Sequence, residues 1–312
     1  MAERSASRLL VLDGATGAVA DRGMGDLPEY LRSGDLLVFN DTRVVAARIV
    51  GAKPSGGRVE IFLERVVVPA SVARAVEGEA GEGDLTRTVE ERRAESAMPL
   101  TGDDQRRSSL PASDPRQALV QLRASKPIRE GLEITTPGGM VRVLGREDEL
   151  WRVETPIDAL EFFETWGEVP LPPYIHRSAD ASDRERYQSI FAREKGAVAA
   201  PTASLHFDAP LVARLEKMGV GCAFVTLHVG AGTFQTLRTD DLDAHKMHAE
   251  RVSVSTATWD AIQRTRAAGG RVVAVGTTVV RALESAALEL ARRAAEPAVL
   301  EAARRAAESA AL

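Results

Sequence analysis

The chain has 312 residues, of which 44% are hydrophobic, and a formal net charge of −5. This apolar fraction excludes a wholly disordered chain, and the length allows two domains with separate cores. The negative charge gives no general attraction to nucleic acid, so an RNA partner would need a local basic face.

The single cysteine, Cys222, cannot form an internal disulfide, which fits a reducing cytosol. No apolar run approaches the roughly 20 residues that span a bilayer. The charged start of the chain, MAERSASRLLVLD, lacks the apolar stretch of a secretory signal. We therefore expect a cytoplasmic protein.

Two apolar runs near the start read as strands: RLLVL at residues 8–12 and LLVFN at residues 36–40. The second run ends in a polar group of four consecutive residues. An Asx turn would need only the amide and the carboxylate, whereas a ligand site also uses the hydroxyl and the guanidinium. Both readings stay open for Asn40, Asp41, Thr42 and Arg43.

The next part of the chain predicts a small β-barrel unit. Residues 46–68 alternate apolar and polar side chains around the turn PSGG, which indicates a hairpin. Strands resume at residues 132–135, 140–143 and 150–153. Residues 69–117 between them are rich in Gly, Ser, Arg, Glu and Asp, which predicts a mostly disordered surface insertion.

From residue 159 onward, helical and strand patterns alternate. We expect helices at residues 159–166, 180–193, 211–218 and 255–268, and strands at residues 223–229 and 271–275. This alternation is typical of an α/β sheet. The predicted fold class is α/β, with an α/β sheet domain (residues 1–48 and 156–312) and an inserted small β-barrel domain (residues 49–155).

Four of the chain's five histidines lie between residues 197 and 250, namely His206, His228, His245 and His248. The predicted strand at residues 223–229 places Thr226, His228 and the turn GAGT at a carboxyl end, where ligands collect in open α/β sheets. Imidazoles transfer protons near neutral pH. The alternative is that each histidine only makes its own hydrogen bonds.

A second candidate site follows the predicted strand at residues 271–275. Gly276, Thr277 and Thr278 lead into a helix that begins near Val279 and carries Arg281 on its first turn. A glycine, two hydroxyls and a helix N-terminus suit an anion.

The segments GDLLVFNDTRVVAAR, PPYIHR, ERYQSIFAREKGAVAAPTASLHF, FVTLHVGAGTFQ, HKMHAE and VVAVGTTVVRALESAA occur in this order. In these segments, across residues 8–287, the chain resembles the S-adenosylmethionine:tRNA ribosyltransferase-isomerases of queuosine biosynthesis. The resemblance implies a β-barrel domain inserted in an α/β domain, in agreement with the patterns above.

The resemblance also implies a reaction. The ribosyl group of S-adenosylmethionine moves to the aminomethyl group of a 7-deazaguanine at the tRNA wobble position and is isomerised. Epoxyqueuosine-tRNA forms, and adenine and methionine leave. S-adenosylmethionine is then a consumed substrate, so we expect no cofactor and no metal, with tRNA as the partner of a monomer.

This chemistry needs a base for the proton beside the sulfonium and an acid for the departing adenine. We expect His206 and His228 to transfer protons, with His248 and Glu250 as further catalytic candidates, and Arg43 and Arg281 to bind anions. The remaining expected substrate-binding residues are Asn40, Asp41, Thr42, Arg48, Tyr187, Thr202, Thr226, Gly230, Gly232, Thr233 and Thr277.

Three other readings stay open. A weakly active or inactive homologue would only bind tRNA or S-adenosylmethionine, since the family's C-terminal Asn-Phe-His-Leu-Pro motif is replaced here by ARRAAE repeats. A metal hydrolase could use His245 and His248, although no complete ligand triad is evident. A methyltransferase would want a better glycine-rich loop than LLVLDGATG.

Overall fold

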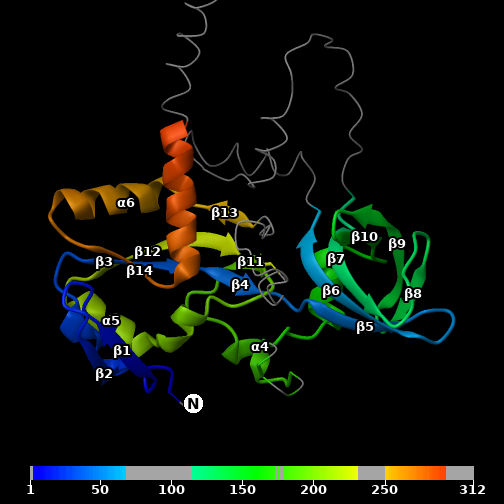
Figure 1. Ribbon diagram of the computed structural model, residues 1–312, viewed down its shortest axis with the longest axis horizontal. Coiled ribbons are helices and arrows are strands. Elements are labelled where there is room, and N and C mark those ends of the chain that lie inside the picture. Colours follow the sequence, from blue (N-terminus) through cyan, green and yellow to red (C-terminus); the bar gives the residue numbers. More distant parts are fainter. Residues whose placement is uncertain are drawn as a thin grey trace, which may run out of the picture.

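The computed structural model describes residues 3–67, 114–172, 174–175, 177, 179–230 and 250–292. These residues form a four-stranded sheet with helices on both faces and, beside it, a closed six-stranded barrel (Figure 1). The predicted α/β class with a small barrel is thereby confirmed. Among the described residues, no helix has both the length and the apolar character that a membrane crossing requires.

The first half of the chain supplies most of the strands. Its elements are β1 (Arg8–Leu12), β2 (Val19–Gly23), the 3-10 helix η1 (Met24–Tyr30), β3 (Leu36–Asn40), β4 (Thr42–Val44), β5 (Arg48–Ala52), β6 (Arg58–Val66), β7 (Gln117–Ala124), β8 (Glu133–Thr136), β9 (Gly139–Glu147) and β10 (Leu150–Glu154).

The second half alternates helices and strands, as its pattern predicts. Its elements are α3 (Ala159–Trp166), α4 (Asp183–Arg186), β11 (Glu194–Ala197), the 3-10 helix η2 (Thr202–His206), α5 (Ala209–Lys217), β12 (Gly221–His228), β13 (Arg251–Ser253), α6 (Thr256–Ala267), β14 (Val272–Ala274) and a helix over residues 277–292.

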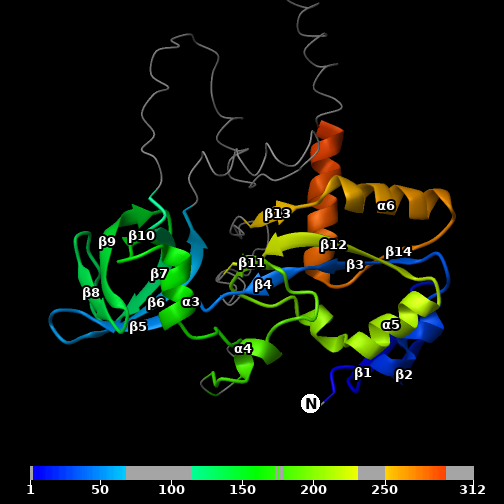
Figure 2. The same cartoon turned by 180° about the vertical axis from the view of Figure 1, so that it is seen from behind.

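The four-stranded sheet has the order β13-β12-β3-β14. β12 and β14 both run parallel to β3, and β13 runs antiparallel to β12. Every residue of β3 is buried, as expected for a central strand covered on both faces. In Figures 1 and 2, α6 and the helix over residues 277–292 lie on one side of the sheet, and α5 lies with the β1–β2 hairpin on the other.

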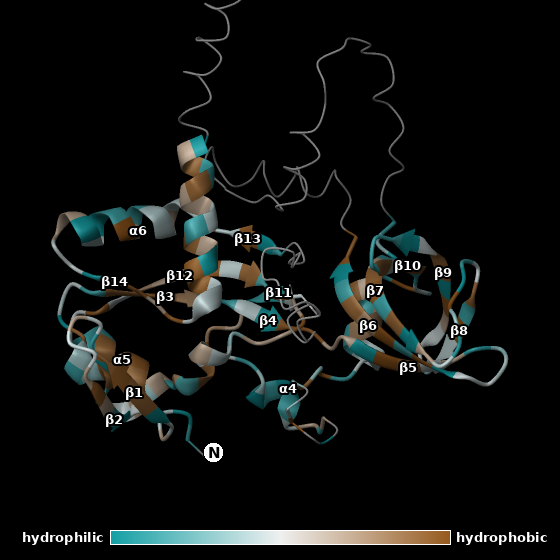
Figure 3. Ribbon diagram, viewed as in Figure 1, coloured by the Kyte–Doolittle hydropathy of each residue, from teal (hydrophilic) through white to brown (hydrophobic). Residues whose placement is uncertain are grey.

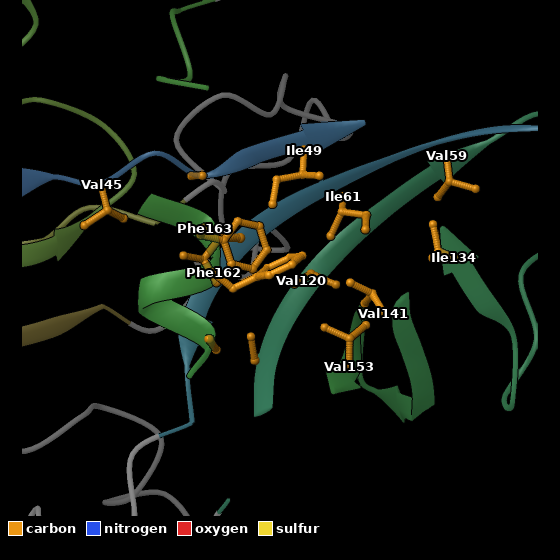
Figure 4. Packing of buried hydrophobic residues seen from close by; sticks show 14 of the residues in the cluster. Val45, Ile49, Val59, Ile61, Val120, Ile134, Val141, Val153, Phe162 and Phe163 are labelled. Atoms are coloured by element: carbon orange, nitrogen blue, oxygen red, sulfur yellow. The ribbon is translucent and has the colours of Figure 1, made fainter. Parts of the chain in front are cut away.

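The barrel closes in the order β10-β7-β6-β5-β8-β9. Its interior is filled by β-branched residues from these strands and by Phe162 and Phe163 of α3 (Figure 4). Because α3 fills the barrel core, we propose that the barrel unit extends beyond the expected boundary at residue 155.

The barrel is attached next to the carboxyl edge of the sheet. After β3, the chain enters β4, which pairs in parallel with β11. The N–H of Val45 donates to Ala197 (2.9 Å), and the N–H of Leu63 donates to Ala47 (2.8 Å). These bonds hold the linker between β11 on one side and β6 of the barrel on the other.

The predicted helix at residues 180–193 is wrong, since only α4 is helical there. The buried carboxylate of Asp183 accepts from both terminal nitrogens of Arg177 (2.6 and 2.7 Å). The amide of Gln188 bonds both backbone groups of Val44 (2.9 and 2.7 Å). The Arg177 bonds hold the start of α4, which is mostly hydrophilic in Figure 3, and the Gln188 bonds attach the chain after α4 to β4.

Two segments that the sequence analysis names lie largely or wholly outside the residues that the structure describes. The predicted disordered insertion at residues 69–117 lies outside the described residues except for its last four positions, and Gln117 already begins β7. The second ARRAAE repeat also lies outside them.

Candidate active site

The side chain of Asn40 continues the pairing of β3 with β12 beyond the backbone ladder, which ends with Asn40 opposite Val225. Asn40 Nδ2 donates to the carbonyl of Leu227 (3.0 Å), and Oδ1 accepts from the N–H groups of Leu227 (3.1 Å) and Thr42 (3.2 Å). The amide is buried. Asn40 therefore fixes two strand ends relative to each other rather than facing an open surface.

The neighbouring Asp41 organises a charged group at the same strand ends. Thr226 Oγ1 donates to Asp41 Oδ1 (2.7 Å), and Arg193 Nη2 donates to Asp41 Oδ2 (3.0 Å). The Arg193 guanidinium carbon lies 4.3 Å from the centre of the Phe224 ring. The carboxylate and the ring together hold a partly exposed guanidinium in one place, which suits binding of a carboxylate or phosphate.

The side chains of Thr42 and His228 are in contact at the same strand ends. His228 Nδ1 lies 2.8 Å from Thr42 Oγ1, which in turn lies 3.4 Å from the carbonyl oxygen of Glu194. A carbonyl only accepts, so when the Thr42 hydroxyl donates to Glu194, its oxygen accepts from Nδ1–H of the imidazole. In that arrangement the proton of the neutral His228 ring is on Nδ1, and Nε2 carries none.

The surroundings of His228 keep its imidazole neutral. Burial and, to a smaller extent, the positive charge of Arg251, its cross-strand neighbour on β13, lower the pKa of His228 from 6.5 to about 4. At neutral pH the ring is therefore uncharged, with one nitrogen free to accept a proton.

Gly196 allows the His228 ring to lie against β11. Its backbone has φ +144°, and a Cβ built on it would lie only 3.0 Å from the ring atoms Cε1 and Nδ1 of His228. The β4–β11 register shifts between Lys195 and Ala197, on either side of this glycine. Only glycine combines that backbone angle with that close approach.

Gly230 makes a similarly close approach two residues after His228. A Cβ at this position would overlap the carboxylate of Glu64, which comes from β6 of the barrel. The barrel therefore contacts the chain directly at the end of β12.

Glu250 and Arg281 form a pair of their own, with Arg281 Nη1 donating to Glu250 Oε2 (2.5 Å). Thr277 is the exposed first residue of the helix over residues 277–292. It follows Gly276, which has φ +97° and lies next to Ala203 of η2. The expected anion-binding Arg281 thus already has an intramolecular carboxylate partner.

The structure gives His206 and Thr202 surroundings different from those of His228. His206 Nδ1 lies 2.8 Å from Ser7 Oγ, near the start of the chain. Thr202 is exposed at the first position of η2. The described contacts do not bring His206 to His228.

Three further expected residues lie on β4, on β5 and just after α4. Arg43 is exposed on β4. Arg48 Nε lies 2.6 Å from Glu60 Oε1 in the barrel, an ion pair rather than an aligned hydrogen bond. Tyr187 is buried beside Val44, and burial raises the pKa of its hydroxyl to about 12. Four other expected or possible site residues lie outside the described residues: Gly232, Thr233, His245 and His248.

The sequence patterns did not single out several residues of this site. Arg193 was hidden inside the wrongly predicted helix, although it directly precedes β11. Strand alternation places Glu64 on the outer face of the barrel, which predicts an exposed side chain. Contact with Gly230 at the end of β12 buries it instead. Gly196 carried no signal beyond being a glycine within a strand.

Among the described residues, no group of three or more His, Cys, Asp or Glu side chains is placed to hold a metal ion. The carboxyl edge of the sheet instead gathers a neutral imidazole, a fixed guanidinium and a carboxylate from the barrel.

A mixed α/β sheet beside a closed six-stranded barrel, with polar side chains gathered at the carboxyl edge of the sheet's parallel strands, defines an α/β protein of the kind that binds ligands at that edge. The sequence model of the family described as "Queuosine biosynthesis protein" matches residues 1–305. The chain belongs to this family, and the resemblance seen in the sequence is confirmed.

Relatives that are named for an enzymatic activity match most of the chain. It is 48% identical over 289 residues to the S-adenosylmethionine:tRNA ribosyltransferase-isomerase of Xanthomonas euvesicatoria pv. vesicatoria (strain 85-10), covering 92% of this chain and 68% of that protein. It is 46% identical over 290 residues to the protein of the same name from Azoarcus sp. (strain BH72), covering 92% and 70%. The chain thus spans about two thirds of the length of these relatives.

One solved structure, an S-adenosylmethionine tRNA ribosyltransferase from Thermotoga maritima, is similar over 91% of this chain and 66% of that chain. Its sequence is 23% identical, and the TM-score is 0.33.

Proposed function

We propose that this protein is an S-adenosylmethionine:tRNA ribosyltransferase-isomerase. It would transfer and isomerise the ribosyl group of S-adenosylmethionine onto 7-aminomethyl-7-deazaguanine at the tRNA wobble position, releasing adenine and methionine. The observation that carries the proposal is the neutral, hydrogen-bonded His228 at the joined ends of β3 and β12, in a chain 46–48% identical to relatives of that name.

The state of His228 suits the first proton transfer. A sulfonium acidifies the protons on the ribose carbon attached to it, and a base must remove one of them. Nε2 of His228 has a free lone pair because Nδ1–H is held by Thr42. Once the proton has moved to Nε2, the imidazolium passes it to solvent or product readily, since its pKa is low.

Departing adenine needs a proton, and in this proposal another group supplies it, because His228 is uncharged at neutral pH and acts as the base. His206 and His248 are the candidates that we propose for that role. His206 is exposed and bonded to Ser7.

Anion binding fits Arg193 better than Arg281. The Arg193 guanidinium is fixed by Asp41 and Phe224 while remaining 58% exposed. Arg281 is engaged with Glu250. Arg193, together with the exposed Arg43 on β4, would bind the methionine carboxylate or a tRNA phosphate. In this proposal S-adenosylmethionine is a substrate and not a cofactor, and the protein acts as a cytoplasmic monomer.

The test is to mix the protein with S-adenosylmethionine and tRNA that carries the aminomethyl precursor, and to follow adenine by chromatography. Stoichiometric release of adenine and methionine is expected. Binding of both ligands without adenine release would support the weakly active or inactive homologue instead. Formation of S-adenosylhomocysteine would identify a methyltransferase and contradict the proposal.

A further inference from the structure

The carboxylate of Glu64 brings a charge from the barrel to the ligand-binding edge of the sheet. Glu64 is only 7% exposed. Buried carboxylates are held by hydrogen bonds or opposite charges. One of its contacts is the side-chain amide of Gln121, whose Nε2 lies 3.3 Å from Glu64 Oε2.

The backbone of β6 directs this side chain. In the pairing of β6 with β7, Leu63 lies opposite Val120 and Arg65 opposite Leu119, so Glu64 is the extra residue of a β-bulge. Bulges redirect one side chain and occur often beside active sites. Gln121, which bonds Glu64, lies opposite Phe62 and therefore on the outer face of the barrel. Glu64 thus points out of the barrel, toward the end of β12.

The carboxylate of Glu64 packs against Gly230 at the end of β12. A Cβ on Gly230 would overlap Oε1 of Glu64, so the carboxylate lies directly against that backbone. Gly230 is two residues from His228, whose Nδ1 binds Thr42. The acid of the barrel and the imidazole of the sheet thus both lie at the end of β12.

We propose that Glu64 binds a cationic group of the substrate at this edge. The inference rests on the proposed function, in which two such groups occur: the sulfonium of S-adenosylmethionine and the ammonium of the aminomethyl nucleobase. A buried carboxylate binds either through charge complementarity, which is strong where water is excluded. The inserted barrel then serves to close the charged side of the site.

The experiment compares the wild type with Glu64→Gln, which keeps the shape and removes the charge. Calorimetry measures binding of S-adenosylmethionine and of S-adenosylhomocysteine, which lacks the sulfonium. Gel-shift titrations compare tRNA carrying the aminomethyl base with tRNA carrying guanine there. Glu133→Gln is the matched control, because Glu133 lies exposed on the same barrel and pairs with Arg142. Circular dichroism verifies that each variant is folded.

If Glu64 binds the sulfonium, the variant loses about 10-fold or more in affinity for S-adenosylmethionine while S-adenosylhomocysteine binding is unchanged. If it binds the ammonium, the same loss falls on the aminomethyl tRNA alone. Either result supports the inference. Unchanged affinity for both charged ligands in a folded Glu64→Gln protein overturns it. A wild type that binds no S-adenosylmethionine contradicts the proposed function instead.

Discussion

Thr42 and His228 are 186 positions apart in the sequence, and Thr42 Oγ1 lies 2.8 Å from Nδ1 of His228. The contact exists because the side chain of Asn40 holds the ends of β3 and β12 together and directs Thr42 into β4. A single amide thus positions both the proposed base and the hydroxyl that sets its tautomer.

Replacing Thr42 with Val should slow turnover and leave the fold intact, because valine has nearly the same shape and cannot accept from Nδ1–H. His228 is then free to take the other tautomer or to rotate. We expect kcat for adenine release to fall roughly 10- to 100-fold, within the contribution of general acid–base catalysis, with little change in KM. Thr42→Ser keeps the hydroxyl and should retain most of the activity. An unchanged kcat in Thr42→Val would show that the contact has no part in catalysis.

The lowered pKa of His228 predicts a loss of stability in acid. Folding holds its pKa at about 4 instead of 6.5, so the unfolded chain binds the proton more readily. Between these two values stability therefore falls as pH falls, by about 3 kcal/mol in total. Urea unfolding of the wild type and of His228→Gln, at several pH values from 7 to 4, measures the difference. The variant should lack this part of the pH dependence, and parallel curves for the two proteins would refute the assignment.

Gly196→Ala tests the approach of β11 to the imidazole. The substitution adds a methyl group 3.0 Å from the ring and imposes φ +144° on a residue with a side chain. We expect a cost of about 2–4 kcal/mol in the free energy of unfolding and a clear loss of activity. Thermal unfolding and adenine release provide the two measurements.

A matched control for this substitution is Gly56→Ala. Gly56 also has a positive φ, +83°, but nothing lies within 4 Å of the added methyl group. It should cost only about 1 kcal/mol and leave activity unchanged. If Gly196→Ala behaves in the same way as Gly56→Ala, the contact with His228 is unimportant.

The backbone framework was largely predictable from the sequence. LLVFN and the run from Ala223 onward are short, apolar and bounded by turns, and the structure places both as neighbouring parallel strands. Parallel strands bring their carboxyl ends to one edge, so the polar residues that follow them were expected to be close. For Asp41, Thr42, Thr226 and His228 the contacts agree with that expectation.

The rest depended on contacts that local patterns do not encode. Period-two alternation assigns Glu64 to the outer face of the barrel, where it would be exposed, but the side chain is buried because it lies against Gly230 at the end of β12. The sequence pattern assigns Arg193 to a helix because its neighbours have helical spacing, whereas Gln188 bonds the backbone of Val44 instead. His206 seemed equivalent to His228 in the sequence, yet its partner Ser7 comes from the N-terminal segment.

The opposite end of the sheet offers a test of whether function is confined to the carboxyl edge. Asp35 immediately precedes β3, and its buried carboxylate accepts from Nε (3.1 Å) and Nη2 (2.5 Å) of Arg271. It also accepts from the backbone N–H groups of Arg271 and Arg32. These bonds tie together the chain segments that enter β3 and β14, and the Arg271 guanidinium holds the pKa of Asp35 well below its usual value of 3.8.

Asp35→Asn should therefore lower the free energy of unfolding by about 2–4 kcal/mol at pH 7, since it leaves part of the Arg271 charge without its partner. The sign of the pH dependence follows from the lowered pKa. The stabilisation is complete above pH 3.8 and is lost as pH falls below it, so the wild type and the variant should converge in strong acid. Urea unfolding at pH 7 and pH 3 measures this.

Asp35 lies one strand length, roughly 16 Å, from the carboxyl edge. The kcat and KM of Asp35→Asn for adenine release should therefore match those of the wild type at a temperature where both proteins are folded. A large change in KM with the fold intact would mean that the substrate reaches this end of the sheet as well.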